Sequence, residues 1–169
     1  MTYVGGTIDD PIGWKIDSWE QVAPGEFHGI EAAARLQHLA GVLGEALDQV
    51  AVNEGLANQG DYQVLSLLRL AEHQGESMTA TDVARQLGMT TATMVNRVDR
   101  LERLGYVERS PHLIDRRASI LNITPDGVAC ADRMVRRRTE ERERRLAVLS
   151  DRERTTLTAL LRKLTEGWR

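Results

Sequence analysis

The strongest constraint on the fold lies between residues 79 and 123, where two short helical segments precede two short strand-like segments. Thr79 can cap the first helical segment, TATDVARQLGM, and Gly88 is well suited to end it in a left-handed turn. The second segment, TTATMVNRVDRLERLG, can begin at Thr90 and end at Gly105. Two short helices joined by a tight glycine turn are typical of a helix-turn-helix.

A β-hairpin is expected directly after this helix pair. Two strand-like runs, at 106–109 and 118–123, flank a polar loop. A helix-turn-helix followed by such a hairpin is a winged helix. The sequence therefore predicts a mainly α fold with a small β wing, in which a winged helix-turn-helix lobe is joined to long N- and C-terminal helices.

The loop of the hairpin predicts contacts with DNA. The minor groove of B-DNA is only about 6 Å wide, and its negative potential attracts flat guanidinium groups. We expect Arg117, together with Arg116, to reach into this groove. Asp115 would orient these arginines or brace the loop, and His112 would touch a phosphate. The alternative is a charged turn that is merely solvated.

The second helix of the pair is predicted to have a polar face that fits the major groove of DNA. At about 100° per residue, its apolar residues fall on one side: Met94, Val95, Val98 and Leu101. Asn can pair with adenine, Arg with guanine, and Thr can contact a phosphate or a thymine methyl group. The predicted DNA-binding residues of this segment are Thr90, Thr91, Thr93, Asn96, Arg97, Arg100 and Arg103. The alternative is an ordinary amphipathic helix with a solvated face.

The sequence as a whole predicts that the chain has four parts. Residues 1–28 form an N-terminal arm with a possible short helix near 17–22, and residues 29–60 form an N-terminal dimerisation helix and a linker. Residues 61–123 form the DNA-binding lobe, whose first helix Asp61 can cap. Residues 124–169 form C-terminal dimerisation helices, the first of which runs to about Leu149. Ser150-Asp151-Arg152-Glu153 has the pattern of a capping box for the last helix.

The composition of the chain favours some classes of function and excludes others. Residues 1–61 hold ten acidic and two basic residues, whereas residues 62–169 hold fifteen and twenty, a balance that favours a polyanionic partner for the second part. No apolar run approaches the roughly 18 residues that a membrane span needs, and the N-terminus does not resemble a secretion signal. A single cysteine, Cys130, fits the cytoplasm. We see no catalytic motif and no metal-ligand spacing, and therefore expect neither an enzyme nor a cofactor.

The sequence resembles the MarR family, the multiple-antibiotic-resistance regulators. The similarity lies in TDVARQLGMTTATMVNRVDRLERLGYVERS, then DRRAS, then LNITPDG. It implies a symmetric homodimer that binds a pseudo-palindromic operator on double-stranded DNA, usually as a repressor. It also implies release of the DNA by a small aromatic or anionic effector, whose identity the sequence does not give. The alternative function is a winged-helix module for protein–protein contacts without an operator.

The long terminal helices and the N-terminal arm add two expectations. The apolar stripes of the terminal helices favour a dimer, although packing within one chain is the alternative. The arm segment DSWEQV resembles the extra helix of the urate-responsive subgroup of the family. That resemblance implies Trp19, Gln63 and Arg97 as ligand-binding residues, and it also matches Arg117. Gln63 stands where the subgroup has an aspartate, and Trp19 could instead anchor the arm by packing.

Overall fold

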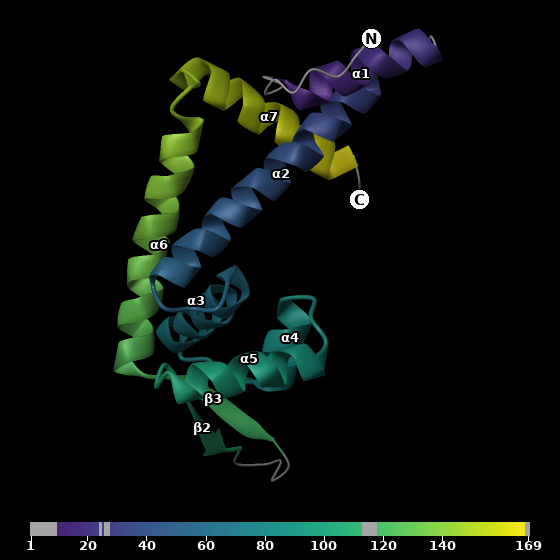
Figure 1. Ribbon diagram of the computed structural model, residues 1–169. Coiled ribbons are helices and arrows are strands. Elements are labelled where there is room, and N and C mark those ends of the chain that lie inside the picture. The colour runs from purple at the N-terminus through teal and green to yellow at the C-terminus, as the bar shows by residue number, and fades with distance from the viewer. Residues whose placement is uncertain (1–9, 24, 26–27, 113–117, 168–169) are drawn as a thin grey trace. The chain divides into compact units, whose positions relative to one another are not determined.

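The computed structural model describes residues 10–23, 25, 28–112 and 118–167. The chain divides into two compact units, residues 1–45 and 46–169. Helix α2 (His28–Asn53) begins in the first unit and ends in the second. Figure 1 shows the elements along the chain.

The first unit contains helix α1 (Pro11–Val22) and most of α2. Asp10 caps α1 by accepting a hydrogen bond from the Gly13 amide at 2.9 Å, and Pro11 occupies the first helical position. Arg35 on α2 binds the same carboxylate through two nitrogens, at 3.0 and 2.6 Å. The short helix expected in the arm is therefore longer than residues 17–22, because Asp-Pro is a strong helix start.

The second unit holds the helix-turn-helix and the wing. Its elements are α3 (Gln59–Gln74), β1 (Met78–Thr79), α4 (Ala80–Gln86), α5 (Thr91–Arg103), β2 (Val107–Pro111), β3 (Ser119–Ile123), α6 (Pro125–Leu146) and α7 (Asp151–Gly167). The predicted fold class is confirmed: the chain is mainly helical with a small antiparallel sheet. Helix α6 ends at Leu146, three residues before the predicted end.

The turns of the helix pair follow the predicted chemistry. Thr79 and Asp82 form a reciprocal capping box at the start of α4. Gly88 has a φ of 63°, a left-handed conformation that glycine adopts without a steric penalty. Thr90 caps α5 by accepting a hydrogen bond from the Thr93 amide at 3.2 Å. These local contacts fix the short connection between α4 and α5.

The start of α3 differs from the prediction. The cap is Asn58, whose side chain accepts a hydrogen bond from the Gly60 amide at 2.9 Å. Asp61, the predicted cap, lies in the first turn of the helix and is completely buried. It points toward the positive charges of α5 instead, because two arginines there bind its carboxylate.

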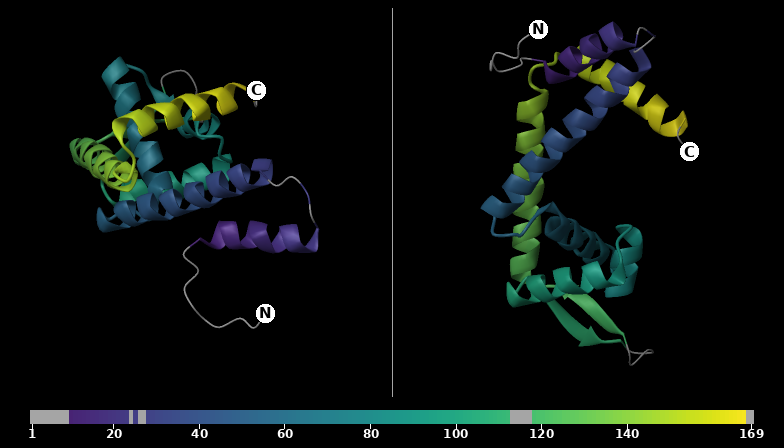
Figure 2. Two further views of the ribbon diagram at one scale, coloured as in Figure 1. Left: turned by 90° about the horizontal axis from the view of Figure 1, so that it is seen from above. Right: turned by 45° about the vertical axis from the view of Figure 1, so that its right-hand side comes forward.

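The sheet has the strand order β1–β3–β2, and both pairs are antiparallel. The predicted hairpin is present, with Val107 opposite Ile123 and Pro111 opposite Ser119. The sequence did not indicate β1, whose Met78 pairs with Leu121. Figure 2 shows the hairpin strands beside α5.

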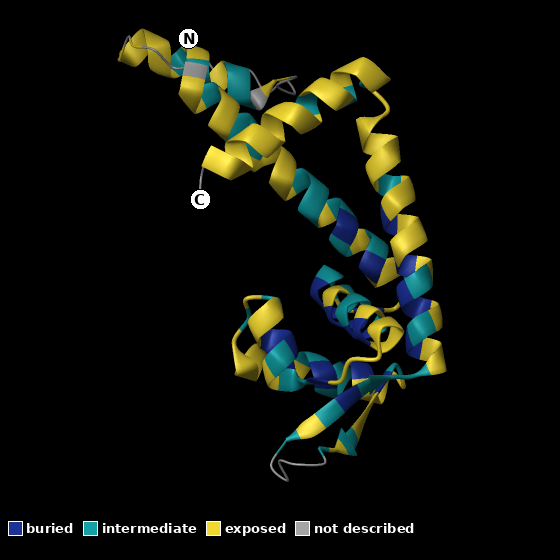
Figure 3. Cartoon of the chain, turned by 180° about the vertical axis from the view of Figure 1, so that it is seen from behind, coloured by how far each residue is buried: buried dark blue, intermediate teal, exposed yellow. Residues whose placement is uncertain are grey.

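The core of the second unit lies between α3, α5, β3 and the first half of α6, where Figure 3 shows the buried residues. Its largest fully buried apolar side chains include Leu65, Met94, Leu101 and Met134. Gly127 in the first turn of α6 packs against the backbone carbonyl of Tyr106, and a Cβ there would collide with that oxygen. The close approach brings α6 directly against the end of the helix-turn-helix.

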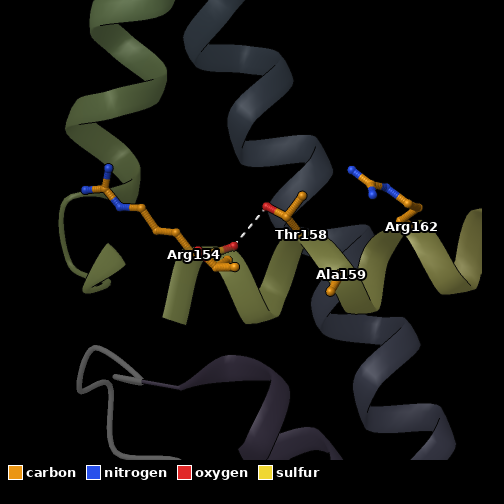
Figure 4. Close-up of a pocket in the computed structure, with 5 residues that line it drawn as sticks. Arg154, Thr158, Ala159 and Arg162 are labelled. Atoms are coloured by element: carbon orange, nitrogen blue, oxygen red, sulfur yellow. Dashed lines mark hydrogen bonds between the residues drawn. The ribbon is translucent and has the colours of Figure 1, made fainter. Parts of the chain in front are cut away.

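Helix α7 has no buried residue among those the structure describes. The predicted capping box is present, since the Ser150 amide and hydroxyl both donate to Glu153 at 2.8 and 2.6 Å. Leu160, Leu161 and Leu164 are exposed. Figure 4 shows the residues of α7 that line a hollow, from Arg154 to Arg162. None of the described helices has the length and apolarity to cross a membrane.

Candidate nucleic-acid interface

Helix α5 presents one face to the core and the other to solvent. Met94, Val98 and Leu101 are fully buried. Val95, which the sequence placed on the same side, is 40% exposed, because it lies about 100° around the helix from Met94. Most of the predicted DNA-binding residues of this segment are exposed: Thr90, Thr91, Thr93, Asn96 and Arg103.

Two predicted DNA-binding arginines of α5 bind an acid inside the protein. Arg100 donates to the buried Asp61 from Nε at 2.8 Å and from Nη2 at 2.5 Å. Arg97 Nη1 lies 3.5 Å from the same carboxylate. The bond to Asp61 raises the pKa of Arg100 above its usual range. Both guanidinium groups therefore face α3 and not the outer surface of α5.

The start of α3 is shaped to receive Arg97. The Nη1 atom of Arg97 donates to the Asn58 side chain at 2.8 Å. Gly60 lies against the guanidinium, and a Cβ at this position would collide with it. The amide of Ala57 also donates to Asp61, at 3.2 Å. This cluster joins the beginning of α3 to the middle of the helix that would enter DNA.

An ion pair connects the wing to α5. Arg109 on β2 donates to Asp99 on α5 at 2.5 Å, and a second nitrogen lies 3.7 Å from Glu102. His112, which follows β2, is half-buried, and its amide donates to the Ala118 carbonyl at 3.3 Å. Asp115, Arg116 and Arg117, which were predicted to contact the minor groove, lie outside the described residues.

The predicted ligand-binding residues belong to different parts of the chain. Trp19 is 53% exposed and lines a hollow between α1 and α2, with Ile16, Ile30 and His38 among its neighbours. Gln63 is exposed on α3. The acid that contacts Arg97 is Asp61, two residues earlier than Gln63.

Arg138 on α6 is a candidate functional residue that the sequence analysis missed. Its guanidinium carbon lies 4.5 Å from the centroid of the Tyr62 ring, within the range of a cation–π contact. The residue is only 5% exposed, and its Nε and Nη1 have no hydrogen-bond partner among the described residues. Burial lowers the pKa of Arg138, and the nearby Arg142 lowers it further.

The helical periodicity of α6 is a sequence signal that points to Arg138. The buried residues of α6 are Gly127, Cys130, Ala131, Met134 and Arg138. This spacing of three and four residues is that of one helix face. A charged residue that continues an apolar stripe is a signal of a buried charge.

The elements around α5 define the class of protein. A helix-turn-helix whose second helix exposes polar side chains, followed by a hairpin wing, is a winged-helix DNA-binding fold. A sequence profile of the MarR family matches residues 54–118. Together with the similarity to the relatives below, the match shows that the chain belongs to the MarR family. The protein is therefore a DNA-binding transcriptional regulator.

Relatives and solved structures agree with this assignment. The chain is 29% identical over 126 residues to the HTH-type transcriptional regulator PecS of Dickeya dadantii (strain 3937), which covers 75% of each chain. The DNA complex of MepR from Staphylococcus aureus matches with a TM-score of 0.66 and 20% identity, over 80% of this chain and 96% of that chain. CouR from Rhodococcus jostii RHA1, bound to p-coumaroyl-CoA, matches with a TM-score of 0.59 and 25% identity, over 76% and 87%.

Proposed function

We propose that the protein is a homodimeric repressor that binds a pseudo-palindromic operator in the cytoplasm and is released by a small aromatic or anionic molecule. The observation that carries this proposal is the exposed polar face of α5 beside a wing strand that Arg109 ties to Asp99. A major-groove helix and a minor-groove wing must keep a fixed spacing to bind neighbouring grooves at once. The MepR–DNA complex supports the same use of this fold.

Each predicted DNA-binding residue has a proposed role. Asn96 contacts a base edge in the major groove, where its amide can pair with adenine. Arg97 and Arg100, which Asp61 holds on one flank of α5, contribute positive charge to the DNA-binding surface. Backbone phosphates are contacted by Thr90, Thr91, Thr93, Arg103 and His112. Arg116 and Arg117 enter the minor groove and Asp115 orients them.

The proposed dimer assigns roles to the parts of the chain. Residues 61–123 bind DNA, and residues 29–60 and 124–169 join two copies, with residues 1–28 as an arm. The exposed leucines of α7 support this division, because a continuous apolar face of this kind is usually covered by a partner. A twofold dimer would place two α5 helices about one turn of DNA apart.

The proposed effector is supported by Arg138. A guanidinium that is buried beside an aromatic ring, with two donor nitrogens unpaired among the described residues, is suited to bind a carboxylate. CouR is a relative that binds an aromatic acyl-CoA. Trp19, Gln63 and Arg97 are proposed as further ligand contacts. A ligand that binds the free protein better than the DNA-bound form would release the operator.

Binding to DNA is tested by fluorescence anisotropy with duplexes from the region upstream of the protein's own gene. We expect tight binding that weakens steeply with salt, because each phosphate contact releases counterions. Asn96→Ala should weaken binding to the preferred duplex more than to random DNA. Failure to bind any of these duplexes at low salt would refute the proposed function.

The effector is tested with aromatic carboxylates of graded size added to the preformed DNA complex. We expect some of them to release the DNA, and Arg138→Met to abolish this response while operator binding remains. Arg137→Met is the matched control, because Arg137 neighbours Arg138 on α6 but its side chain is 62% exposed. If aromatic carboxylates still released the DNA from Arg138→Met, Arg138 would not belong to the effector site.

A further inference from the structure

The outer face of α5 lacks a free guanidinium near its N-terminal end, and this absence limits which base pairs it can read. We propose that α5 reads A·T base pairs at the centre of each half-site, through the amide of Asn96 and the methyl groups of Ala92 and Val95. The inference rests on the proposed function, in which α5 enters the major groove. It adds the chemical class of the operator that the helix recognises.

The geometry of α5 places these three residues on the outer face of its first turns. Met94, Val98 and Leu101 face the core. At about 100° per residue, Asn96 lies nearly opposite this buried stripe and Ala92, four residues earlier, shares its face. Val95 lies toward the wing, on the flank that also carries Asp99, which binds Arg109. Ala92, Val95 and Asn96 are all exposed.

Asp61 occupies the two arginines that could otherwise read guanine. Arginine recognises guanine by donating to O6 and N7, and Arg100 already uses Nε and Nη2 on Asp61. Arg97 uses Nη1 on Asn58 and lies beside the same acid. If Arg100 left, the fully buried carboxylate of Asp61 would lose its two shortest hydrogen bonds, a change that is strongly unfavourable.

Arg103 is exposed, but it lies too far along α5 to read the same base pair as Asn96. Seven residues separate the two, which corresponds to about 10 Å along a helix. The Nε atom of Arg103 also donates to the backbone carbonyl of Asp99 at 3.3 Å. Arg103 is therefore placed for the DNA backbone, which adds affinity without sequence preference.

The remaining groups match adenine and thymine. The side-chain amide of asparagine pairs with N6 and N7 of adenine, and apolar side chains contact the methyl group of thymine. Neither Ala92 nor Val95 can donate to guanine or accept from cytosine. A recognition face built from one amide and two apolar side chains therefore favours A·T pairs.

The test begins with selection of bound duplexes from a random pool by the full-length protein. We expect A·T pairs at the centre of each selected half-site. Replacing a central thymine by deoxyuracil removes only the methyl group, and each such replacement should lower affinity about fourfold, as expected for one buried methyl group. In Val95→Ala this loss should shrink for at least one thymine. Asn96→Ala should reduce the preference for adenine by roughly 5- to 150-fold.

Arg103→Ala serves as the control, because it should weaken binding to all duplexes equally and leave the selected sequence unchanged. Selection of G·C pairs at the central positions, with a preference that disappears in Arg100→Ala, would overturn the inference while operator binding stands. Equal affinity for thymine and deoxyuracil duplexes would also overturn the assignment of Ala92 and Val95. Absence of any selected sequence would overturn both this inference and the proposed function.

Discussion

Arg100 binds both carboxylate oxygens of Asp61, although 39 residues separate the two in the chain. The acid is fully buried in the first turn of α3, whereas the arginine is partly exposed on α5. This pair links the beginning of α3 to α5, the helix that we propose enters DNA. It helps to set how α5 is rotated about its own axis, and therefore which of its side chains are exposed on the side away from α3.

Asp61→Asn should lower the free energy of unfolding by about 2–3 kcal/mol, because hydrogen bonds to charged groups are strong and two arginines lose their charged partner. Urea unfolding at one protein concentration measures the change. Asp99→Asn is the control, since that pair with Arg109 is partly exposed and such pairs contribute about 1 kcal/mol or less. Equal losses in the two variants would contradict a special role for Asp61.

The sequence predicted the parts of the fold that depend on near neighbours. Thr79, Gly88 and Thr90 act through contacts within a few residues, so their caps and turns could be recognised directly. Strand β1 could not, because it has only two residues and exists through its pairing with β3. A two-residue run has no periodicity to detect.

The candidate site was predicted less completely for a similar reason. The polar face of α5 followed from helix geometry, and Asn96 is exposed as that geometry requires. The pairing of Arg100 with Asp61 depends on how α3 and α5 pack, which no local pattern encodes. Asp61 therefore looked like a helix cap in the sequence. The roles of Arg116 and Arg117 in the minor groove stay predictions.

Arg109→Ala should weaken operator binding by up to about fivefold, which corresponds to the ~1 kcal/mol of a partly exposed ion pair. The physical reason is that β2 is no longer tied to Asp99, so the wing must be positioned when DNA binds. Fluorescence anisotropy at low salt measures the affinity. Exchanging the charges, with Asp99→Arg and Arg109→Asp together, should restore part of the loss; unchanged affinity in Arg109→Ala would show that the pair does not position the wing.

Gly127→Ala should destabilise the protein by about 2–3 kcal/mol, at the upper end of the cost of overpacking. The new methyl group would collide with the carbonyl oxygen of Tyr106, a backbone atom that cannot rotate away. The matched control is Gly29→Ala in α2, where nothing lies within 4 Å of the added carbon. That variant should be unchanged or more stable by up to about 1 kcal/mol, since alanine favours helix. Thermal unfolding distinguishes the two.

The attachment of α1 to α2 should depend on pH. Arg35 and the Gly13 amide lower the pKa of Asp10 from 3.8 to about 2. A carboxylate with a lowered pKa stabilises the folded form above its ordinary pKa, and this contribution is lost as the pH falls from about 4 to about 2. Fluorescence of Trp14 and Trp19 on α1, with Trp168 replaced by phenylalanine, should report the loss. In Asp10→Asn the tryptophan fluorescence at pH 7 should already resemble that of the wild-type protein at low pH. If the fluorescence change with pH were unaltered in this variant, groups other than Asp10 would cause it.

Arg138→Met should leave the free energy of unfolding unchanged or raise it, although it removes a side chain from the core. The guanidinium is 5% exposed and two of its nitrogens have no hydrogen-bond partner among the described residues. Replacing a buried charge that lacks a full set of partners by an apolar group of similar size removes the cost of keeping that charge away from water, so the change should be neutral or stabilising. The contact with the Tyr62 ring opposes this gain, but such contacts contribute only about 0.5–2 kcal/mol. Urea unfolding of Arg138→Met beside Arg138→Ala separates charge from volume, because only alanine should leave a cavity. A loss of several kcal/mol in the methionine variant would mean that the positive charge itself stabilises the fold, and the case for Arg138 as a ligand-binding residue would weaken accordingly.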